Sequence, residues 1–325
     1  MESQRPMVSI LMLAYNHEKY IRQALDGILM QKVNFTYEIV VGEDCSQDNT
    51  RVILLKYKKE HPDKIILILN EKNIGMHRNL SKVREHCTGK YVASCEGDDY
   101  WTDPSKLQKQ VDFLENNSQF IGTAHKVEIV DENGNLINGF NMDMYCKDKI
   151  YTIKHAEKGI MPGQSASLVY RNILSNDPVT INAINNCKAN GDKIMSVYLA
   201  LNGNIYCLDE VMSHHRWVTT GGDSWSARTK GKNMNLYLFK SYVELSKLAQ
   251  QLKGYEMDYT ERYLSCGLGA FIILIKNPNR NNYKIFIEII KNYKSKSEMA
   301  LYILKRFISF PRRRINRVLL RLRKE

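Results

Sequence analysis

The sequence predicts an α/β fold, in which a mostly parallel β-sheet is covered by helices and followed by a helical C-terminal extension. In the first hundred residues, nearly continuous apolar runs alternate with segments whose apolar residues recur every three or four positions. This is the pattern of buried strands separated by amphipathic helices. From about residue 233 onward the helical pattern dominates. We therefore expect a sheet domain over residues 1–230 and a helical extension over residues 231–325.

The elements of the sheet domain are predicted in chain order. Asn16 is the expected N-cap of the first helix, and Ser46 or Asp48 that of the second. Beyond residue 100 an Asn-Gly turn predicts a hairpin over residues 122–139. The predicted strands are residues 7–15, 37–44, 64–70, 90–99, 165–171 and 204–217, and the predicted helices are residues 16–32, 47–61, 73–87, 105–117 and 191–203.

Composition excludes several classes of protein. With 325 residues, 43% hydrophobic and 25% charged, the chain can bury a large core. The longest apolar run, residues 264–275, is too short to span a bilayer and predicts a buried helix. The first ten residues do not resemble a signal peptide, so we expect a cytoplasmic protein. Seven cysteines and eight histidines occur without CxxC or HxxxH spacing, so no zinc site is expected.

The net charge of +12 is concentrated in the tail. The last 25 residues carry nine Lys or Arg against one Glu. After Pro311, apolar residues recur at helical spacing from Ile315 to Leu322, with arginines on the other face. Such a helix suits an anionic membrane surface; the alternative is a terminal helix that packs its leucines on the body. Aromatic residues are not interleaved with these arginines, so a nucleic-acid partner is not expected.

Acidic residues gather where the fourth predicted strand ends, in the stretch CEGDDYWTDP. Asp103, followed by Pro104, is expected to start a helix. A role in a turn does not account for the three other acidic residues, Glu96, Asp98 and Asp99. Polar residues also follow the first two strands, and the carboxyl ends of parallel strands share one edge of a sheet, where ligands bind. Because bare carboxylates repel phosphates, this pattern favours a polyanionic ligand bridged by a cation.

Several segments occur together in a familiar order. The chain resembles the inverting family 2 glycosyltransferases of the GT-A fold, of the type that builds bacterial surface polysaccharides, over about residues 7–225. That fold is Rossmann-like, with a mostly parallel sheet. The segments that carry the resemblance are SILMLAYNHEKYIRQALDGILMQ, EIVVGEDCSQDNT, NIGMHRNL, TGKYVASCEGDDYWTDPSKLQKQVDFLE, GDKIMSVYLALNG and LDEVMSHHRW.

The resemblance implies a nucleotide pocket along the first two strand ends. Ala14, Tyr15, Asn16 and Asp44 match segments that hold the base and ribose, with Asp44 accepting from the base. Arg78 matches an arginine that lines the donor pocket. A turn role for Asp44 and a surface role for Arg78 are the alternatives.

The resemblance also implies a metal site and a catalytic base. Glu96 and Asp98 take the place of the DxD motif and are the expected ligands of Mn²⁺ or Mg²⁺. The neighbouring Asp99 is expected to take part in binding the donor. Asp192 matches the catalytic base, although a plain helix N-cap is the alternative. Arg216, with His215, matches the segment that closes over the diphosphate.

Two positions depart from the family pattern. Glu96 replaces the first aspartate of the motif, which leaves its contact with the metal open. Val218 stands where the family often has a histidine.

The expected function is therefore metal-assisted transfer of a sugar, with inversion, to a hydroxyl of a glycan or lipid-linked acceptor. UDP is the favoured nucleotide of the donor. The expected location is the inner face of the cell membrane, held peripherally by the basic tail. A sugar nucleotidyltransferase would usually carry a glycine-rich phosphate loop, which LAYNHEKY lacks. A non-enzymatic membrane adaptor is the other alternative, and the intact acidic residues argue against it.

Overall fold

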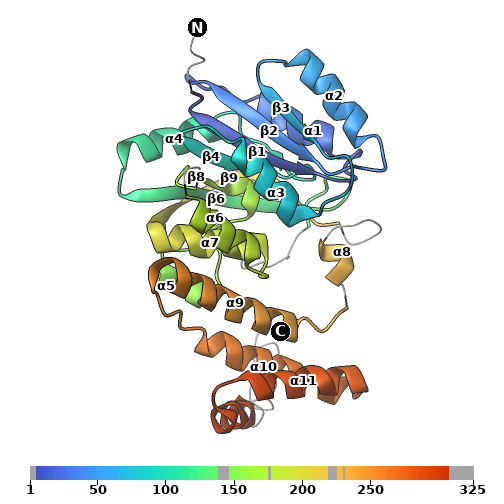
Figure 1. The fold of residues 1–325 in the computed structure, drawn as a ribbon, viewed down its shortest axis with the longest axis vertical. Helices are drawn as coiled ribbons and strands as arrows, with labels where there is room; N and C mark the ends of the chain where they lie inside the picture. Colours follow the sequence, from blue (N-terminus) through green and yellow to red (C-terminus); the bar gives the residue numbers. More distant parts are fainter. Residues whose placement is uncertain (1–4, 138–145, 175–176, 219–224, 230, 307–325) are drawn as a thin grey trace, which may run out of the picture.

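A β-sheet flanked by helices forms the upper part of the computed structural model, and a group of helices forms the lower part (Figure 1). The structure describes residues 5–137, 146–174, 177–218, 225–229 and 231–306. Within these residues the strands are β1 (Val8–Ala14), β2 (Tyr37–Glu43), β3 (Ile65–Leu69), β4 (Tyr91–Ser94), β5 (Tyr100–Trp101), β6 (Phe120–Val130), β7 (Ile150–Tyr151), β8 (Val169–Arg171) and β9 (Asn204–Arg216). The predicted basic helix of the tail lies outside the described residues.

Helices cover both faces of the sheet, as the apolar strands predict. The helices of the described residues, those of the extension included, are α1 (Ile21–Leu29), α2 (Thr50–Glu60), α3 (Met76–Glu85), α4 (Lys106–Asn116), α5 (Ile153–Glu157), α6 (Pro178–Asn186), α7 (Gly191–Asn202), α8 (Trp225–Thr229), α9 (Asn235–Lys253), α10 (Thr260–Lys276) and α11 (Arg280–Asn292), with a further helical segment over residues 296–306. Alternate residues of one strand enter different cores: Ile10 packs in the cluster that contains α1 residues, whereas Leu11 packs in the cluster that contains Val83 of α3. The sheet is therefore buried on both sides.

The parallel half of the sheet has the order β3-β2-β1-β4, and the other half continues as β8-β6-β9-β5. β8 is antiparallel to both neighbours, while β6 and β9 run parallel. The fold is the predicted mostly parallel α/β sheet with a helical extension.

The predicted hairpin over residues 122–139 forms at its turn, as far as the described residues extend. An antiparallel bridge joins Val130 and Leu136, and the Ile137 N–H donates to the Ile129 carbonyl at 2.8 Å. The first arm of the hairpin is part of β6, which also pairs along its length with β9, more than 80 residues further along the chain. The local turn signal does not reveal this long-range pairing.

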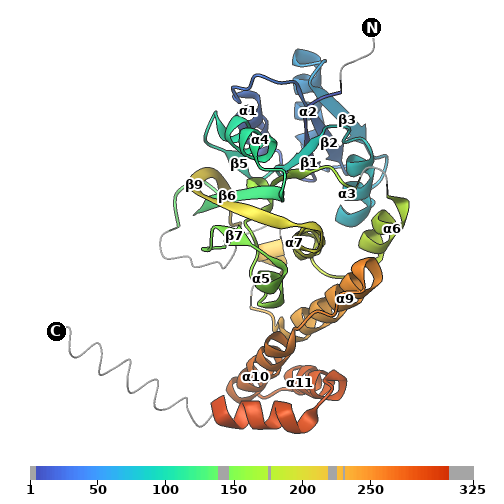
Figure 2. The ribbon, with the colours of Figure 1, turned by 90° about the vertical axis from the view of Figure 1, so that its left-hand side faces the viewer.

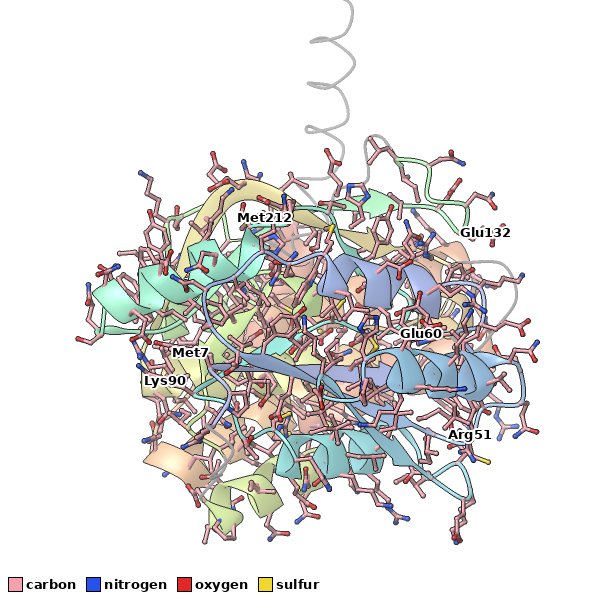
Figure 3. All side chains as sticks on the ribbon, turned by 90° about the horizontal axis from the view of Figure 1, so that it is seen from above. Met7, Arg51, Glu60, Lys90, Glu132 and Met212 are labelled. Atoms are coloured by element: carbon pink, nitrogen blue, oxygen red, sulfur yellow. The ribbon has the colours of Figure 1, made fainter. Side chains whose placement is uncertain are left out.

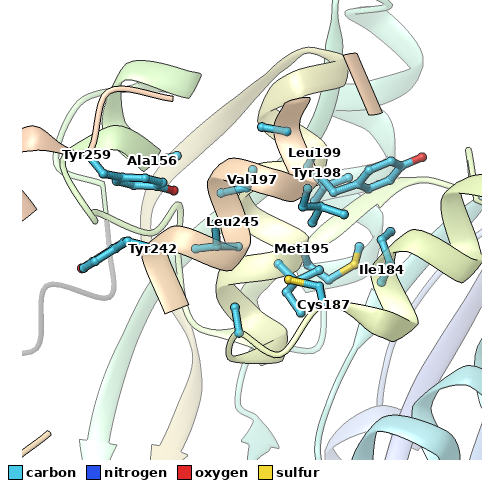
Figure 4. Packing of buried hydrophobic residues seen from close by; sticks show 14 of the residues in the cluster. Ala156, Ile184, Cys187, Met195, Val197, Tyr198, Leu199, Tyr242, Leu245 and Tyr259 are labelled. Carbon is cyan, nitrogen blue, oxygen red and sulfur yellow. The ribbon is translucent and has the colours of Figure 1, made fainter. Parts of the chain in front are cut away.

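The helical extension packs on the sheet domain through α9. Tyr242 and Leu245 of α9 belong to the same buried cluster as Val197 and Tyr198 of α7 (Figure 4). Turned by 90°, the molecule shows α10 and α11 beyond α9, on the side away from the sheet (Figure 2). No described helix has the length and hydropathy needed to cross a bilayer. The boundary near residue 230 stays a prediction.

Candidate functional site

The carboxyl ends of β1, β2 and β4 meet at one edge of the sheet. The N–H of Asp44 donates to the Ala14 carbonyl at 3.0 Å, and the N–H of Gly97 donates to the Leu13 carbonyl, also at 3.0 Å. Viewed from above, Met7 and Lys90, which precede β1 and β4, lie on one side of the molecule (Figure 3). Arg51, whose guanidinium pairs with Glu43 at the end of β2, lies on the opposite side. The polar strand ends therefore converge as predicted.

The segment after β1 is a loop and not the start of a helix. Asn16 has a left-handed backbone (φ 57°), a conformation that asparagine tolerates better than most residues. Its N–H donates to the Ser46 hydroxyl at 3.0 Å, and its side-chain oxygen accepts from the N–H of Gln47 at 2.9 Å. Because α1 begins only at Ile21, the prediction of Asn16 as N-cap is wrong. Asn16 instead joins the loops that follow β1 and β2.

Asp44 orders the loop that leads into α3. Its carboxylate, only 3% exposed, accepts from the N–H groups of Ile74 and Gly75, each at 2.9 Å, and from the Asn70 amide at 3.1 Å. Arg78 follows on the first turn of α3 and is exposed. Asp44 thus positions the backbone that presents Arg78, and its predicted contact with a base stays a prediction.

The other two residues predicted to hold the nucleotide differ in exposure. Ala14 is 1% exposed, and its carbonyl accepts from the Asp44 N–H, so the residue is buried in this structure and its predicted contact with the nucleotide stays a prediction. Tyr15 is partly exposed.

Three carboxylates form the centre of the site. Burial raises the pKa of Glu96 well above its usual value, and the negative charges of Asp192 and Asp98 raise it further. Burial likewise raises the pKa of Asp98, against the opposing charge of His17, and that of Asp192, against the charge of His215. The charge of Asp99 raises the pKa of all three carboxyls, so Glu96, Asp98 and Asp192 share one electrostatic environment.

The site is narrow where the acidic loop passes the loop after β1. A Cβ added to Gly97 would lie 2.6 Å from His17 Nδ1 and 2.9 Å from Ile21 Cδ1. Only a glycine fits there without displacing these side chains. This explains the glycine between the acidic residues.

Asp192 is not the N-cap of α7. Asn190 holds that position, and its side chain accepts from the N–H of Asp192 at 2.9 Å. No described residue donates a hydrogen bond to the Asp192 carboxylate, which is partly exposed. The helix N-cap alternative for Asp192 is therefore excluded, and its role as a base stays a prediction.

Asp99 turns into the protein and holds the end of β9. Its carboxylate is 1% exposed and accepts from the Arg216 N–H at 2.8 Å and from the Gln164 amide at 2.6 Å. His215 Nδ1 lies 3.0 Å from the same carboxylate. Burial alone would lower the pKa of His215, but the carboxylates of Asp99, Asp98 and Glu96 raise it to about 9. His215 therefore carries a positive charge at neutral pH and offsets part of the acidic cluster.

Arg216 is engaged with protein, where the resemblance implied a contact with diphosphate. The residue is 4% exposed, and its guanidinium lies 4.5 Å from the centre of the Tyr20 ring. It donates to the carbonyl of Asp98 at 3.0 Å and to the side chain of Gln23 at 2.7 Å, with two further bonds to the carbonyls of residues 131 and 132. In this structure Arg216 braces the acidic loop, and the diphosphate contact stays a prediction.

Several residues of the site were not marked by the sequence. Tyr20 and Gln23, which hold Arg216, lie almost 200 positions before it in the chain, so no local spacing could reveal the contact. Their roles depend on the tertiary fold.

Replacing Glu96 with Gln is expected to stabilise the metal-free protein at neutral pH. The pKa of Glu96 is higher in the folded protein than in the unfolded chain, so the protonated form of Glu96 favours folding. Its contribution to the free energy of unfolding is full below the pKa of the unfolded chain and is lost as the pH rises through the pKa of the folded protein. Urea unfolding with a chelator should show the gain at pH 8 and its disappearance near pH 4, about the pKa of an unfolded glutamate.

A matched control is Glu115→Gln. Bonds from Lys90 and Tyr91 lower the pKa of Glu115, so its stabilising effect is present at neutral pH and is lost on acidification. Glu115→Gln should therefore lower the stability of the protein at neutral pH, where Glu96→Gln raises it. A Glu96→Gln protein less stable than wild type at pH 8 would contradict the charge repulsion described here.

Comparison with known proteins agrees with this geometry. The sequence pattern of glycosyl transferase family 2 matches residues 9–172, just over half of the chain. The chain belongs to this family, and its fold is GT-A.

A curated relative, an uncharacterized protein of Mycobacterium tuberculosis, is 35% identical over 209 residues. The match covers 64% of this chain and 58% of that relative's length, which is less than two thirds of the relative.

Two solved structures share the fold. TarS 1–349 of S. aureus, in complex with UDP-GlcNAc, has a TM-score of 0.61 and 18% identity, covering 87% of this chain and 79% of that one. The mannosyltransferase PcManGT of Pyrobaculum calidifontis, in complex with GDP-Man and Mn²⁺, has a TM-score of 0.53 and 14% identity, covering 94% and 87% of the two chains.

Proposed function

We propose that the chain transfers a sugar from a nucleotide-sugar donor, with UDP as the favoured nucleotide, to a hydroxyl of a glycan or lipid-linked acceptor. The observation that carries this proposal is the position of Glu96 and Asp98 after β4 at the carboxyl edge of the sheet, next to His215, whose Nδ1 lies 3.0 Å from the Asp99 carboxylate. The charge of Asp192 raises the pKa of Glu96, which brings Asp192 into the same group. Membership of glycosyl transferase family 2 supports it.

The acidic centre fits a divalent cation. Asp98 is partly exposed, and its carboxylate receives no hydrogen bond from another described residue. The charge of Asp98 also raises the pKa of Glu96, as expected for two carboxylates that lie close together. Such an oxygen donor set suits Mn²⁺ or Mg²⁺. When bound at Asp98 and Glu96, the ion would act as a Lewis acid that stabilises negative charge on the leaving diphosphate.

Asp192 is assigned as the general base. The acceptor oxygen attacks the anomeric carbon as the bond from that carbon to the diphosphate oxygen breaks, and Asp192 takes the proton of the acceptor hydroxyl. Attack opposite to the leaving group inverts the anomeric configuration. Asn190 caps α7, which leaves the Asp192 carboxylate free for this proton transfer.

The loop that Asp44 orders is assigned to the nucleotide. Arg78 is exposed next to this loop, and within the described part of the chain no ion pair occupies its guanidinium. Ala14, Tyr15 and Asn16 border the same edge of the sheet. A nucleoside diphosphate placed along this edge would extend from the loop at Asp44 toward Asp98.

Nucleotide binding that depends on metal is the first expected result. Among UDP, dTDP, GDP and CMP, one is expected to stabilise the wild type in the presence of Mn²⁺, by about 2.7 kcal/mol at 100 times its dissociation constant. Thermal-shift measurements should show this effect in Asp192→Asn but not in Asp98→Ala. Stabilisation of Asp98→Ala equal to that of wild type would contradict the assigned metal site, and no response to any nucleotide would contradict the proposed function.

The proposed location is the cytoplasmic face of the membrane, where a lipid-linked acceptor would lie. The basic residues near the end of the chain support this assignment, since each Lys or Arg near an anionic surface adds about 1 kcal/mol of attraction. A chain that ends at residue 306 should therefore float less efficiently with anionic vesicles, while its hydrolysis of the donor is retained. Equal flotation of the two chains at matched salt would refute membrane anchoring by the tail.

A further inference from the structure

The last turn of α10 is apolar on all sides and is only partly covered by the described part of the chain. The sequence predicts a buried helix over residues 264–275, and the first part of this run is buried, with Ala270 fully so. In the last turn, Phe271 to Ile275, every side chain is at least partly exposed, and Ile275 is 51% exposed. A helix that is apolar all round belongs in a protein core or in contact with lipid. This turn therefore presents an apolar surface to which the transferase centre gives no role.

The hairpin formed by α10 and α11 adds a second exposed apolar side chain. The two helices pack through Phe271 and Phe286, whose ring centres are 5.5 Å apart, and residues 277–279 join them. Tyr283, in the first turn of α11, is 56% exposed. Both helices lie on the side of the molecule away from the sheet (Figure 2). We call residues 275–284 the hairpin tip.

Basic side chains flank the two apolar residues in the hairpin tip. Lys276, Arg280 and Lys284 are all exposed. Among the described residues none of the three forms an ion pair, and the tip contains no acidic residue. The next acidic residue along α11, Glu288, is engaged with Lys240 of α9 at 2.6 Å. The tip therefore combines apolar side chains with positive charges that are available to a partner.

The charge of the whole chain is concentrated in this tip and beyond it. Residues 276–306 contain eight Lys or Arg and two Glu, a net charge of +6, and residues 307–325 contain seven Lys or Arg and one Glu, also +6. Together they account for the net charge of +12, so residues 1–275 are neutral overall. The helical segment over residues 296–306 ends with the same combination of exposed apolar and basic residues, Leu304 and Lys305.

We propose that the hairpin tip binds the surface of an anionic bilayer. Ile275 and Tyr283 enter the interfacial region, and the three basic side chains of the tip reach the lipid head groups. Tyrosine suits this position, since its ring is apolar and its hydroxyl is polar. The inference rests on the proposed function, because a lipid-linked acceptor places the substrate at a bilayer, and it adds a contact that is separate from the tail.

Charge and polarity together select this partner. A second copy packed tip to tip, or the tail of this chain, would bring further positive charge to the hairpin tip and be repelled. Nucleic acid would neutralise the basic residues but would leave Ile275 in a polar environment. An anionic bilayer supplies negative head groups and hydrocarbon at the same place.

Two attachments would fix how the protein lies on the membrane. The tail alone is one attachment, about which the rest of the chain can turn. The hairpin tip adds a second, and α9 packs the extension on α7, at whose start Asp192 lies. Binding through both contacts therefore orients the acidic centre relative to the bilayer, and it is tighter than binding through either contact alone.

Vesicle binding of the full chain tests the proposal. On vesicles of phosphatidylglycerol and phosphatidylcholine in equal amounts, the double variant Ile275→Glu with Tyr283→Glu should bind at least about tenfold more weakly than wild type, because it loses apolar contact and adds negative charge. Val52→Glu on α2, a matched change at another exposed apolar side chain, should bind as wild type does. All three proteins should unfold at the same temperature, since the replaced side chains are exposed. Equal vesicle binding by the double variant and wild type would overturn the proposal.

A tryptophan at the hairpin tip tests entry into the bilayer separately from attraction by charge. Brominated lipid in the same vesicles should quench the fluorescence of Ile275→Trp more than that of Val52→Trp or wild type. Equal quenching would overturn the entry of the tip into the interfacial region. Tighter binding of a DNA duplex than of vesicles at the same salt concentration, lost in the double variant, would overturn lipid as the partner.

Nucleotide binding in the presence of Mn²⁺, measured on the same samples, separates this result from the proposed function. A wild type that binds vesicles through the hairpin tip but binds no nucleotide would contradict the transferase and support the membrane contact. A wild type that binds nucleotide, with vesicle binding unchanged in the double variant, would do the reverse.

Discussion

Asp192→Asn is expected to lower the rate of sugar transfer by about 10²–10⁴-fold, the usual contribution of a positioned general base. The amide keeps the shape of the side chain but cannot take the proton of the acceptor hydroxyl. Binding of the nucleotide with Mn²⁺ should be unchanged, because Asp192 is assigned to the acceptor side of the reaction. Nucleotide release under saturating donor, with calorimetric binding on the same sample, measures both quantities.

The control for this variant is Asn190→Ala. It removes the N-cap of α7, whose side chain accepts from the Asp192 N–H, and should cost about 0.5–2 kcal/mol of stability. Its turnover should remain close to that of wild type. If Asn190→Ala lost as much activity as Asp192→Asn, the role of this segment would be structural and the assignment of the base would fail.

Arg216→Ala is expected to lower the free energy of unfolding by about 3–5 kcal/mol. Loss of the guanidinium removes its bonds to the carbonyls of Asp98, Asp131 and Glu132 and to the side chain of Gln23. The Asp131 carbonyl keeps the Gly134 N–H, but each buried group that is left unsatisfied costs about 1–3 kcal/mol. Solvent near the exposed Glu132 recovers part of this cost. Urea unfolding without nucleotide or metal measures the loss.

Two further variants sharpen this prediction. Arg216→Lys keeps the charge but lacks the planar fork of donors, so it should recover only a small part of the stability. Arg78→Ala removes an exposed arginine and should change stability by less than about 0.5 kcal/mol while weakening nucleotide binding. An Arg216→Ala protein as stable as wild type, with weakened nucleotide binding, would return Arg216 to the role in diphosphate binding that the resemblance implies.

Much of the sheet domain was predictable because its strands are apolar on both faces. β1, β2, β3 and β4 lie within predicted ranges, and Ile10, Ile39 and Val40 are fully buried. Local polar signals were less reliable. The first helix starts five residues after the proposed N-cap at Asn16, and α7 is capped by Asn190 in place of Asp192. The short elements α5, α6 and β5 were not predicted, since each depends on tertiary packing more than on periodicity.

The candidate site was predictable in its composition but not in its contacts. The strand-end rule brought Asp44, Asp98 and Glu96 to one edge of the sheet, as the structure has them. The rule does not say which way a side chain turns. The Asp99 carboxylate accepts from the Arg216 N–H, and the Arg216 side chain donates to the Asp98 carbonyl, so both residues turn into the protein.

The anomeric configuration of the first product tests the central claim most directly. With wild-type protein, Mn²⁺ and the sugar form of whichever nucleotide binds, proton NMR recorded before mutarotation identifies the anomer released or transferred. Single displacement with Asp192 as base predicts the anomer opposite to that of the donor, formed at a rate that falls in Asp192→Asn and Asp98→Ala. A product with the same configuration as the donor would contradict the proposed mechanism.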